Sequence, residues 1–138
     1  ECFDKILDLK SDDINVYGMK GTCLGMLQRY QEAIECFDKV LSLNPDDIKA
    51  HVNKGNNFYH LKKYQEALEC YNKAISLEPV NDYVYSSKGA CLYELQRYRE
   101  AAEWYDKALS LNPNNDLLLN YKKKCLKELK KIQETRDD

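Results

Sequence analysis

The chain has 138 residues and a mass of 16.2 kDa, enough for a single domain with a substantial core. Charged residues make up 32% of it, yet the formal net charge is only −2, which argues against a field that attracts nucleic acid or an anionic membrane. The sequence contains neither an apolar run long enough to span a bilayer nor the basic and apolar segments of a signal peptide.

A sequence repeat of 34 residues recurs along the whole chain. Residues 1–13, ECFDKILDLKSDD, agree with residues 35–47, ECFDKVLSLNPDD, at nine of thirteen positions. Because the chain begins inside a copy, we interpret it as a fragment of a longer protein and residues 1–13 as the second helix of a truncated repeat. Complete copies occupy 14–47, 48–81 and 82–115, and we expect 116–138 to form a capping helix that completes a single domain, 1–138.

Apolar residues in each copy recur with a helical period near 3.6 and predict two helices per copy. In residues 48–81, His51, Gly55 and Phe58 mark the packed face of the first helix, and Pro79 ends the copy because it lacks a backbone N–H. We expect about fifteen residues in each first helix and about thirteen in each second helix. The acids expected to cap the first helices are Asp12 or Asp13, Asp46 or Asp47, Asp82 and Asp116.

Small residues return at two positions of every copy. The glycine column is Gly21, Gly55 and Gly89, and the alanine column is Ala33, Ala67 and Ala101. Because glycine inside a helix costs about 1 kcal/mol relative to alanine, its recurrence indicates that the two helices of a pair approach closely there. The rings predicted to fill the space beside it are Phe37, Tyr71 and Tyr105.

The six cysteines also follow the repeat, in two columns. These are Cys2, Cys36 and Cys70, and Cys23, Cys91 and Cys125. Equivalent residues of stacked helices lie about 8–10 Å apart, whereas a disulfide requires Cα atoms within about 7 Å, and the spacings do not suit a zinc site. We expect small buried residues in a reducing compartment and predict a cytoplasmic location.

The repeated columns resemble those of the tetratricopeptide repeat family over essentially the whole chain. They comprise the glycines, alanines and rings above, together with Tyr30, Tyr64 and Tyr98; Val40, Ala74 and Ala108; and Pro45, Pro79 and Pro113. One departure is a lysine before each glycine (Lys20, Lys54 and Lys88), whose stem can pack while its head reaches water. The resemblance implies an all-α fold, a right-handed α-solenoid of antiparallel helix pairs, with a concave groove that receives peptide segments of partner proteins.

Several columns of the first helices change from copy to copy, and they fall on one face at helical spacing. Steady columns serve packing, so the changing face is the predicted partner-binding groove, with Tyr59, Tyr83 and Tyr93 exposed together. The alternative is a solvated face whose residues vary because they have no binding role. The predicted groove residues are Asn15, Met19, Thr22, Met26, Lys49, Asn53, Asn56, Tyr59, His60, Tyr83, Ser87, Tyr93 and Tyr121.

Some members of the family hold the C-terminal carboxylate of heat-shock chaperones with a clamp of lysine, asparagine and arginine. Aligned on the glycine column, the clamp positions fall on Gly18, Thr22, Asn53, Tyr83 and Ser87, or one copy later on Val52, Asn56, Ser87, Leu117 and Tyr121. Only one residue fits in each register, and a carboxylate requires charge-assisted donors. We therefore expect a groove without this clamp.

Catalysis has little support in the sequence, and we expect no enzyme, catalytic residue, cofactor or metal. His51 occupies a column that serves packing. No repeated cysteine or serine position is expected to face His60, so a nucleophile–base pair is not expected. The paired acids at 12–13 and 46–47 are interpreted as helix caps. No glycine-rich loop or Cys/His metal motif is present.

The expected partner is a protein or peptide, rather than a small molecule, a nucleic acid or a membrane. A competing interpretation is an oligomerisation spacer or regulatory arm of a larger protein. Self-association through the truncated N-terminal end is also expected, since Phe3, Ile6 and Leu7 have lost their paired helix. The lysine-rich tail is interpreted as a polar cap, with a basic patch for an acidic partner or nucleic acid as the alternative.

Overall fold

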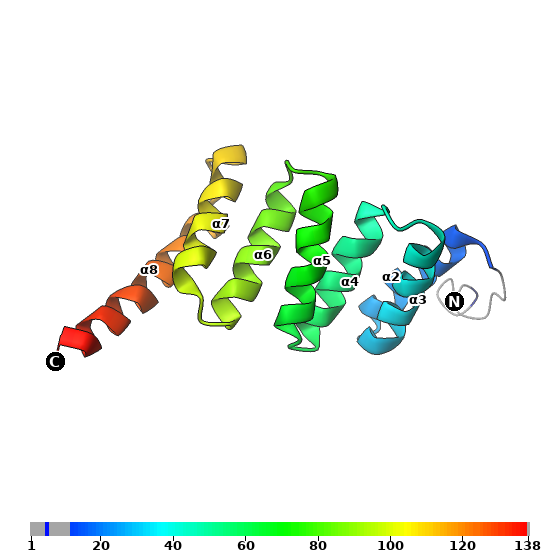
Figure 1. Ribbon diagram of the computed structural model, residues 1–138, viewed down its shortest axis with the longest axis horizontal. Helices are drawn as coiled ribbons and strands as arrows, with labels where there is room; N and C mark the ends of the chain where they lie inside the picture. The colour runs from blue at the N-terminus through cyan, green and yellow to red at the C-terminus, as the bar shows by residue number, and fades with distance from the viewer. Residues whose placement is uncertain (1–4, 6–11, 138) are drawn as a thin grey trace. The chain divides into compact units, whose positions relative to one another are not determined.

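A computed structural model describes residue 5 and residues 12–137 of the chain. The predicted helix at 1–13 and the predicted apolar edge at Phe3, Ile6 and Leu7 lie outside the described residues. Within them the chain forms seven α-helices and no strand, which confirms the predicted all-α class (Figure 1). The chain divides into two compact units, Glu1–Leu77 and Glu78–Asp138. Every helix in the described part of the chain is too short or too polar to cross a bilayer.

The first unit contains two antiparallel helix pairs. They are α2 (Ile14–Met26) with α3 (Tyr30–Leu43), and α4 (Ile48–His60) with α5 (Tyr64–Leu77). Helix α3 packs on both α2 and α4, whereas α2 and α4 touch each other at few positions. The pairs thus stack through the second helix of one and the first helix of the next, as expected of a helical solenoid.

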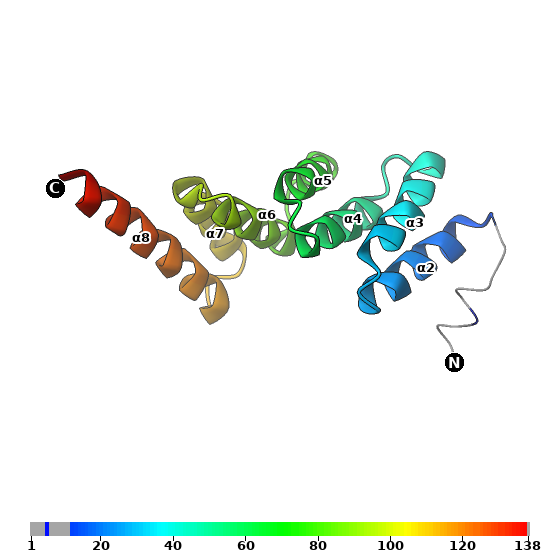
Figure 2. The same ribbon diagram turned by 90° about the horizontal axis from the view of Figure 1, so that it is seen from below.

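The second unit contains one helix pair and a long final helix. The pair is α6 (Asp82–Glu94) with α7 (Tyr98–Leu111), and α8 (Asp116–Asp137) packs on α7. Figures 1 and 2 both show the C-terminal half of α8 extending away from α7. A helix therefore forms at the predicted capping position.

The glycine column lies where the two helices of each pair come closest. A Cβ atom at Gly21 would lie 2.9 Å from Cζ of Phe37, and one at Gly55 would lie 2.8 Å from Cε1 of Tyr71. Real Cβ atoms do not approach rings so closely, which explains why glycine returns here despite its cost in a helix. The alanine column is fully buried at the same crossings.

The predicted helix lengths are wrong by about two residues in the first helices and one in the second. Each first helix has 13 residues and each second helix has 14. The first helices end early because Gln28, Lys62 and Gln96 adopt a left-handed conformation with φ near 60°. At the first turn the N–H groups of Gln28 and Arg29 donate to the carbonyls of Gly25 and Leu24, which closes the helix end.

Two of the predicted caps are confirmed and two are wrong. Asp13 and Asp47 cap α2 and α4, with carboxylates 2.7 Å and 2.8 Å from the N–H groups they accept. Asp82 and Asp116 are instead the first helical residues, and the caps come from the preceding Asn81 and Asn115. An asparagine side chain accepts the same hydrogen bonds, and the aspartate that follows it still lies favourably at the positive end of the helix dipole.

The lysines before the glycines pack as predicted, but two of their heads meet partners in the protein. Nζ of Lys54 lies 2.6 Å from Asp38 and 5.7 Å from the centroid of the Phe58 ring. Nζ of Lys88 lies 3.9 Å from the centroid of Trp104. The five described cysteines are all buried, as predicted, while Cys2 lies outside the described residues.

Candidate functional site

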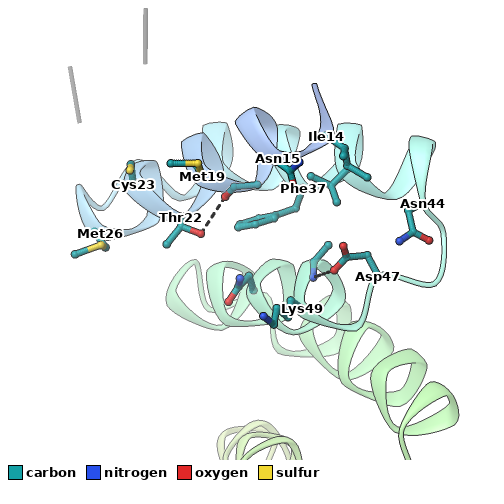
Figure 3. A pocket seen from close by; sticks show the side chains of 14 residues that line it. Ile14, Asn15, Met19, Thr22, Cys23, Met26, Phe37, Asn44, Asp47 and Lys49 are labelled. Carbon is teal, nitrogen blue, oxygen red and sulfur yellow. Dashed lines mark hydrogen bonds between the residues drawn. The ribbon is translucent and has the colours of Figure 1, made fainter. Parts of the chain in front are cut away.

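A groove of about 750 Å³ lies in the first unit between α2 and α4. Figure 3 shows Met26, Thr22, Met19, Asn15 and Ile14 in turn along α2, with α4 below them. The groove exists because α2 and α4 are both held by α3 and hardly meet each other. We call this hollow the α2–α4 groove.

The floor of the α2–α4 groove comes from the packed core. Gly21 has no side chain, so the Phe37 ring of α3 can lie directly against α2 and extend beneath the groove. Val40 of α3 and Ala50 of α4 are buried beside it. The floor is therefore apolar and fixed by the same contacts that hold the helix pair together.

The rim on α2 combines flexible apolar and polar side chains. Met19 and Met26 are 52% and 68% exposed, and both line the groove. Asn15 lies at one end, and Thr22 lies between the methionines with its hydroxyl donating to the Gly18 carbonyl at 3.0 Å. Methionine is unbranched and polarizable, so this rim can adapt to differently shaped apolar groups.

The rim on α4 is polar and carries one cation. Lys49 and Asn53 line the groove from α4, and Asn44 and Asp47 close the end nearest the α3–α4 turn. The Asp47 carboxylate accepts the Ala50 N–H, so its role is structural. Lys49 is exposed and takes part in no ion pair within the described part of the chain.

The structure brings six of the predicted groove residues together along the α2–α4 groove. They are Asn15, Met19, Thr22, Met26, Lys49 and Asn53. The three others predicted in this unit lie elsewhere and make internal contacts. Asn56 accepts the Tyr71 hydroxyl at 2.7 Å, Tyr59 packs edge-on against Tyr64 at 5.4 Å, and His60 stacks on Tyr30 at 5.0 Å.

The four residues predicted in the second unit differ in exposure. Tyr83 is 55% exposed, whereas Tyr93 is half-buried because its ring packs edge-on against Tyr98 at 5.1 Å. The Ser87 hydroxyl donates to the Tyr83 carbonyl, and Tyr121 packs against the ring of another tyrosine of this unit. The expectation that Tyr59, Tyr83 and Tyr93 are exposed together is therefore wrong. The rings of Tyr59 and Tyr93 pack against the first tyrosine of α5 and of α7, respectively.

Sequence reasoning missed the floor and one end of the groove. Phe37 and Val40 belong to a second helix, and their columns indicated packing only, so nothing marked them as groove residues. Asn44 follows α3, and its place near α2 depends on how the turn folds. Gly18 was the one detectable omission, since it lies in a changing column and lines the groove.

His51 and Cys70, two side chains of types that often carry chemistry, have structural surroundings here. No group of three or more His, Cys, Asp or Glu side chains within the described residues could hold a metal ion. Nε2 of His51 lies 2.8 Å from the Pro45 carbonyl, and because a carbonyl only accepts, this nitrogen carries the proton. Burial raises the pKa of the Cys70 thiol to about 11, which keeps it protonated and unreactive near neutral pH.

Comparison with known proteins identifies the repeat. The family profile described as "Tetratricopeptide repeat" matches residues 14–47, 48–81 and 83–115. A search of curated proteins finds no match.

Solved structures include similar tetratricopeptide repeat domains. One is described as "First TPR of Spaghetti (RPAP3) bound to HSP90 peptide SRMEEVD", with 30% identity, a TM-score of 0.81 and coverage of 88% of this chain and 96% of that one. The first TPR domain of human RPAP3 is 29% identical, with a TM-score of 0.81 and coverage of 88% and 95%. The TPR domain of Arabidopsis OM64 is 26% identical, with a TM-score of 0.79 and coverage of 83% and 94%. The repeated columns, the helix pairs and these matches together show that the chain belongs to the tetratricopeptide repeat family.

Proposed function

We propose that this chain is a protein–protein interaction module that binds a peptide segment of a partner protein in the α2–α4 groove. The observation that carries the proposal is the position of six variable residues around one apolar floor, while the repeated residues form the packing beneath it. Family membership supports the general class, because tetratricopeptide repeat domains mediate protein–protein interactions.

The dimensions of the groove suit an extended peptide. Residues 14–26 of α2 line its length, and a rise of 1.5 Å per residue makes this edge about 18 Å long. An extended chain covers the same distance with about five or six residues. Asparagine side chains on both rims carry a donor and an acceptor each, as needed to bind a peptide backbone.

The side chains around the groove favour an internal segment of the partner rather than its C-terminal carboxylate. The solved RPAP3 domain is described in complex with an HSP90 peptide, but the clamp positions of this chain hold Gly18, Tyr83 and Ser87 where cations would be needed. Lys49 is the single cation of the groove lining and lies outside the clamp positions. We expect the partner segment to present apolar groups to Met19 and Met26, with an acidic residue near Lys49.

Tyr83, Ser87, Tyr93 and Tyr121 remain predicted partner contacts of the second unit. We also place the protein in a reducing compartment, with the cytoplasm as the proposal, because Cys36, Cys70 and Cys125 are buried free thiols. Family membership further supports a role in binding without catalysis.

A peptide selection followed by affinity measurement tests the groove. The intact chain is used to select binders from a displayed library of random peptides, and the affinity of the enriched peptides is measured by isothermal titration. The variant Asn15→Ala, Met19→Ala, Asn53→Ala removes rim contacts while leaving the buried floor in place. We expect it to weaken binding about tenfold or more, the size of effect seen when central contacts are truncated.

The matched control variant is Gln31→Ala, Leu43→Ala, Asn72→Ala, which removes two amides and one exposed apolar side chain elsewhere in the first unit. It should bind within about twofold of wild type, well inside one tenfold step. Amidating the C-terminus of each peptide should leave its affinity unchanged; a requirement for the free carboxylate would contradict the proposed mode. Failure to enrich any peptide would favour the competing function, an oligomerisation spacer or regulatory arm.

A further inference from the structure

One face of α8 exposes two leucines among lysines. Leu119 and Leu126 are 37% and 48% exposed, and Lys123, Lys127 and Lys130 are exposed beside them. Leu119, Lys123, Leu126 and Lys130 follow one another at spacings of four, three and four residues, and Lys127 lies four residues after Lys123, which places all five on one face of the helix. We call these five residues the leucine–lysine stripe.

The stripe lies beside the face that packs on α7. Leu118 and Cys125 are buried where α8 packs on α7. Tyr121 packs against the Tyr105 ring with centroids 5.5 Å apart, and Nζ of Lys122 lies 2.6 Å from the carboxylate of Asp106. These contacts fix the rotation of α8, so the stripe is presented as a rigid surface.

The stripe occupies the positions that contact the second helix in a complete repeat. Leu119 and Leu126 correspond, 34 residues later, to Tyr85 and Leu92 of α6. Tyr85 packs edge-on against Trp104 of α7, and Leu92 is 2% exposed. The two leucines are therefore core residues of the repeat pattern that lie at the surface here.

Lys123 prevents a further repeat helix from covering this face in the usual way. It stands in the glycine column, where the Cβ atom that Gly89 lacks would lie 3.0 Å from the Tyr105 ring. Any side chain larger than hydrogen holds a second helix farther away. Whatever covers Leu119 and Leu126 must approach at a greater distance, with room for lysine stems between.

The charge around the stripe selects the covering partner. Residues 122–131 contain six lysines and one glutamate, a net of +5. Lys131 pairs with Glu128 at 2.8 Å and Lys130 with Glu134 at 3.8 Å, but the ion pairs of the described residues do not involve Lys123 or Lys127. The same stripe of a second copy would bring like charges together, which disfavours self-pairing.

We propose that the leucine–lysine stripe binds an acidic amphipathic helix of a partner protein. Leucines of that helix pack between Leu119 and Leu126, while carboxylates along one of its edges pair with Lys123, Lys127 and Lys130. From Leu119 to Lys130 the stripe is about 16 Å long, or three helical turns. A membrane is a poorer match, because the stripe has no tryptophan or phenylalanine to anchor in the interface. This surface is separate from the α2–α4 groove, so the two proposals can fail independently.

Fluorescence anisotropy with a synthetic helix tests the stripe. The probe is a labelled peptide of about four helical turns in which leucines recur three and four residues apart and glutamates fill the flanks. The intact chain should bind it with an affinity that falls as salt is raised. Reversing the three charges in Lys123→Glu, Lys127→Glu, Lys130→Glu should weaken binding about tenfold or more. Leu119→Ser, Leu126→Ser should weaken it to a similar degree.

The control variant Lys39→Glu, Lys62→Glu, Lys63→Glu makes the same change in net charge at exposed positions of the first unit. It should bind within about twofold of wild type, well inside one tenfold step. Fluorescence of Trp104, the only tryptophan, reports whether the second unit stays folded. If charge reversal disturbs it, the glutamine variants at the three stripe positions replace the reversal.

Four results would overturn the proposal. They are equal binding by the stripe and control variants, equal binding of a peptide whose leucines are shuffled out of register, undiminished binding after the leucine substitutions, and stripe-dependent self-association in sedimentation. Tighter stripe-dependent binding to phosphatidylserine vesicles or to single-stranded RNA would also refute it, in favour of those ligands.

Discussion

Replacing Gly55 with alanine adds one methyl group where α4 and α5 come closest. The new Cβ atom would lie 2.8 Å from Cε1 of Tyr71 and 3.1 Å from Cβ of Cys70. The Tyr71 ring is 1% exposed and its hydroxyl is bound to Asn56, so it has no space to retreat. The Cys70 Cβ is attached directly to the backbone of α5 and can move only with the helix.

Two opposing terms set the size of the effect. Alanine is favoured over glycine inside a helix by about 1 kcal/mol, while overpacking a well-filled core costs about 1–3 kcal/mol. At Gly55 the clash dominates, and we expect a net destabilisation of about 1 kcal/mol, up to about 2. Gly18 of α2 provides the matched control, because the nearest atom to its added Cβ would be 4.0 Å away. Gly18→Ala should therefore stabilise the protein by about 1 kcal/mol.

Thermal and urea unfolding followed by circular dichroism will measure both variants against wild type. The same chemical change should lower Tm at Gly55 and raise it at Gly18, each by about 4 °C for a chain of this size. If Gly55→Ala were as stable as wild type, or if both variants shifted in the same direction, close approach of the helices would not explain the glycine column.

Three further predictions concern single contacts. Gly25→Ala should destabilise the wild-type protein, since its Cβ would lie 3.0 Å from Oδ1 of buried Asn57. In the Asn57→Ala background the same substitution should not lower stability, and a double-mutant cycle should give a coupling of about 1 kcal/mol. Burial raises the pKa of Cys70 from its ordinary 9.0 to about 11, so the folded state keeps a proton that the unfolded state loses. The free energy of unfolding should therefore fall between about pH 9 and 11 by at most about 2–3 kcal/mol. Unfolding curves of wild type and Cys70→Ala over this pH range measure the effect, and an equal loss of stability in the two proteins would refute it. Asp38→Asn removes the 2.6 Å ion pair with Lys54 and should cost about 0.5 kcal/mol at low salt and less at high salt in urea unfolding, because Asp38 is half exposed; a salt-independent loss would contradict an ionic origin.

The fold was predictable because each repeated column has one packing role. Glycine at Gly21 and Gly55 has no other explanation than close helix contact, and the rings beside it follow from the space that glycine leaves. Helix ends were less predictable, since Gln28 and Lys62 adopt a left-handed conformation that glycine or asparagine would usually mark. The sequence pattern alone could not distinguish Asp82 as a cap from Asp82 as the first residue of a helix capped by its neighbour.

The site was predictable only in part, because variation does not reveal which way a side chain turns. Met19 and Asn53 vary and line the groove, but Tyr59 varies and packs on Tyr64. The difference arises at the helix end, where a long ring reaches the neighbouring second helix instead of the groove. Phe37 shows the opposite case, a steady core residue whose ring also forms the groove floor.

The central claim is that a peptide bound by this chain lies in the α2–α4 groove. The chain has only two methionines, and both line this groove. With ¹³C-methyl methionine, titration of a selected peptide should shift the NMR signals of Met19 and Met26 together, with the dissociation constant found by calorimetry. Tight binding that leaves both methyl signals in place would contradict the claim.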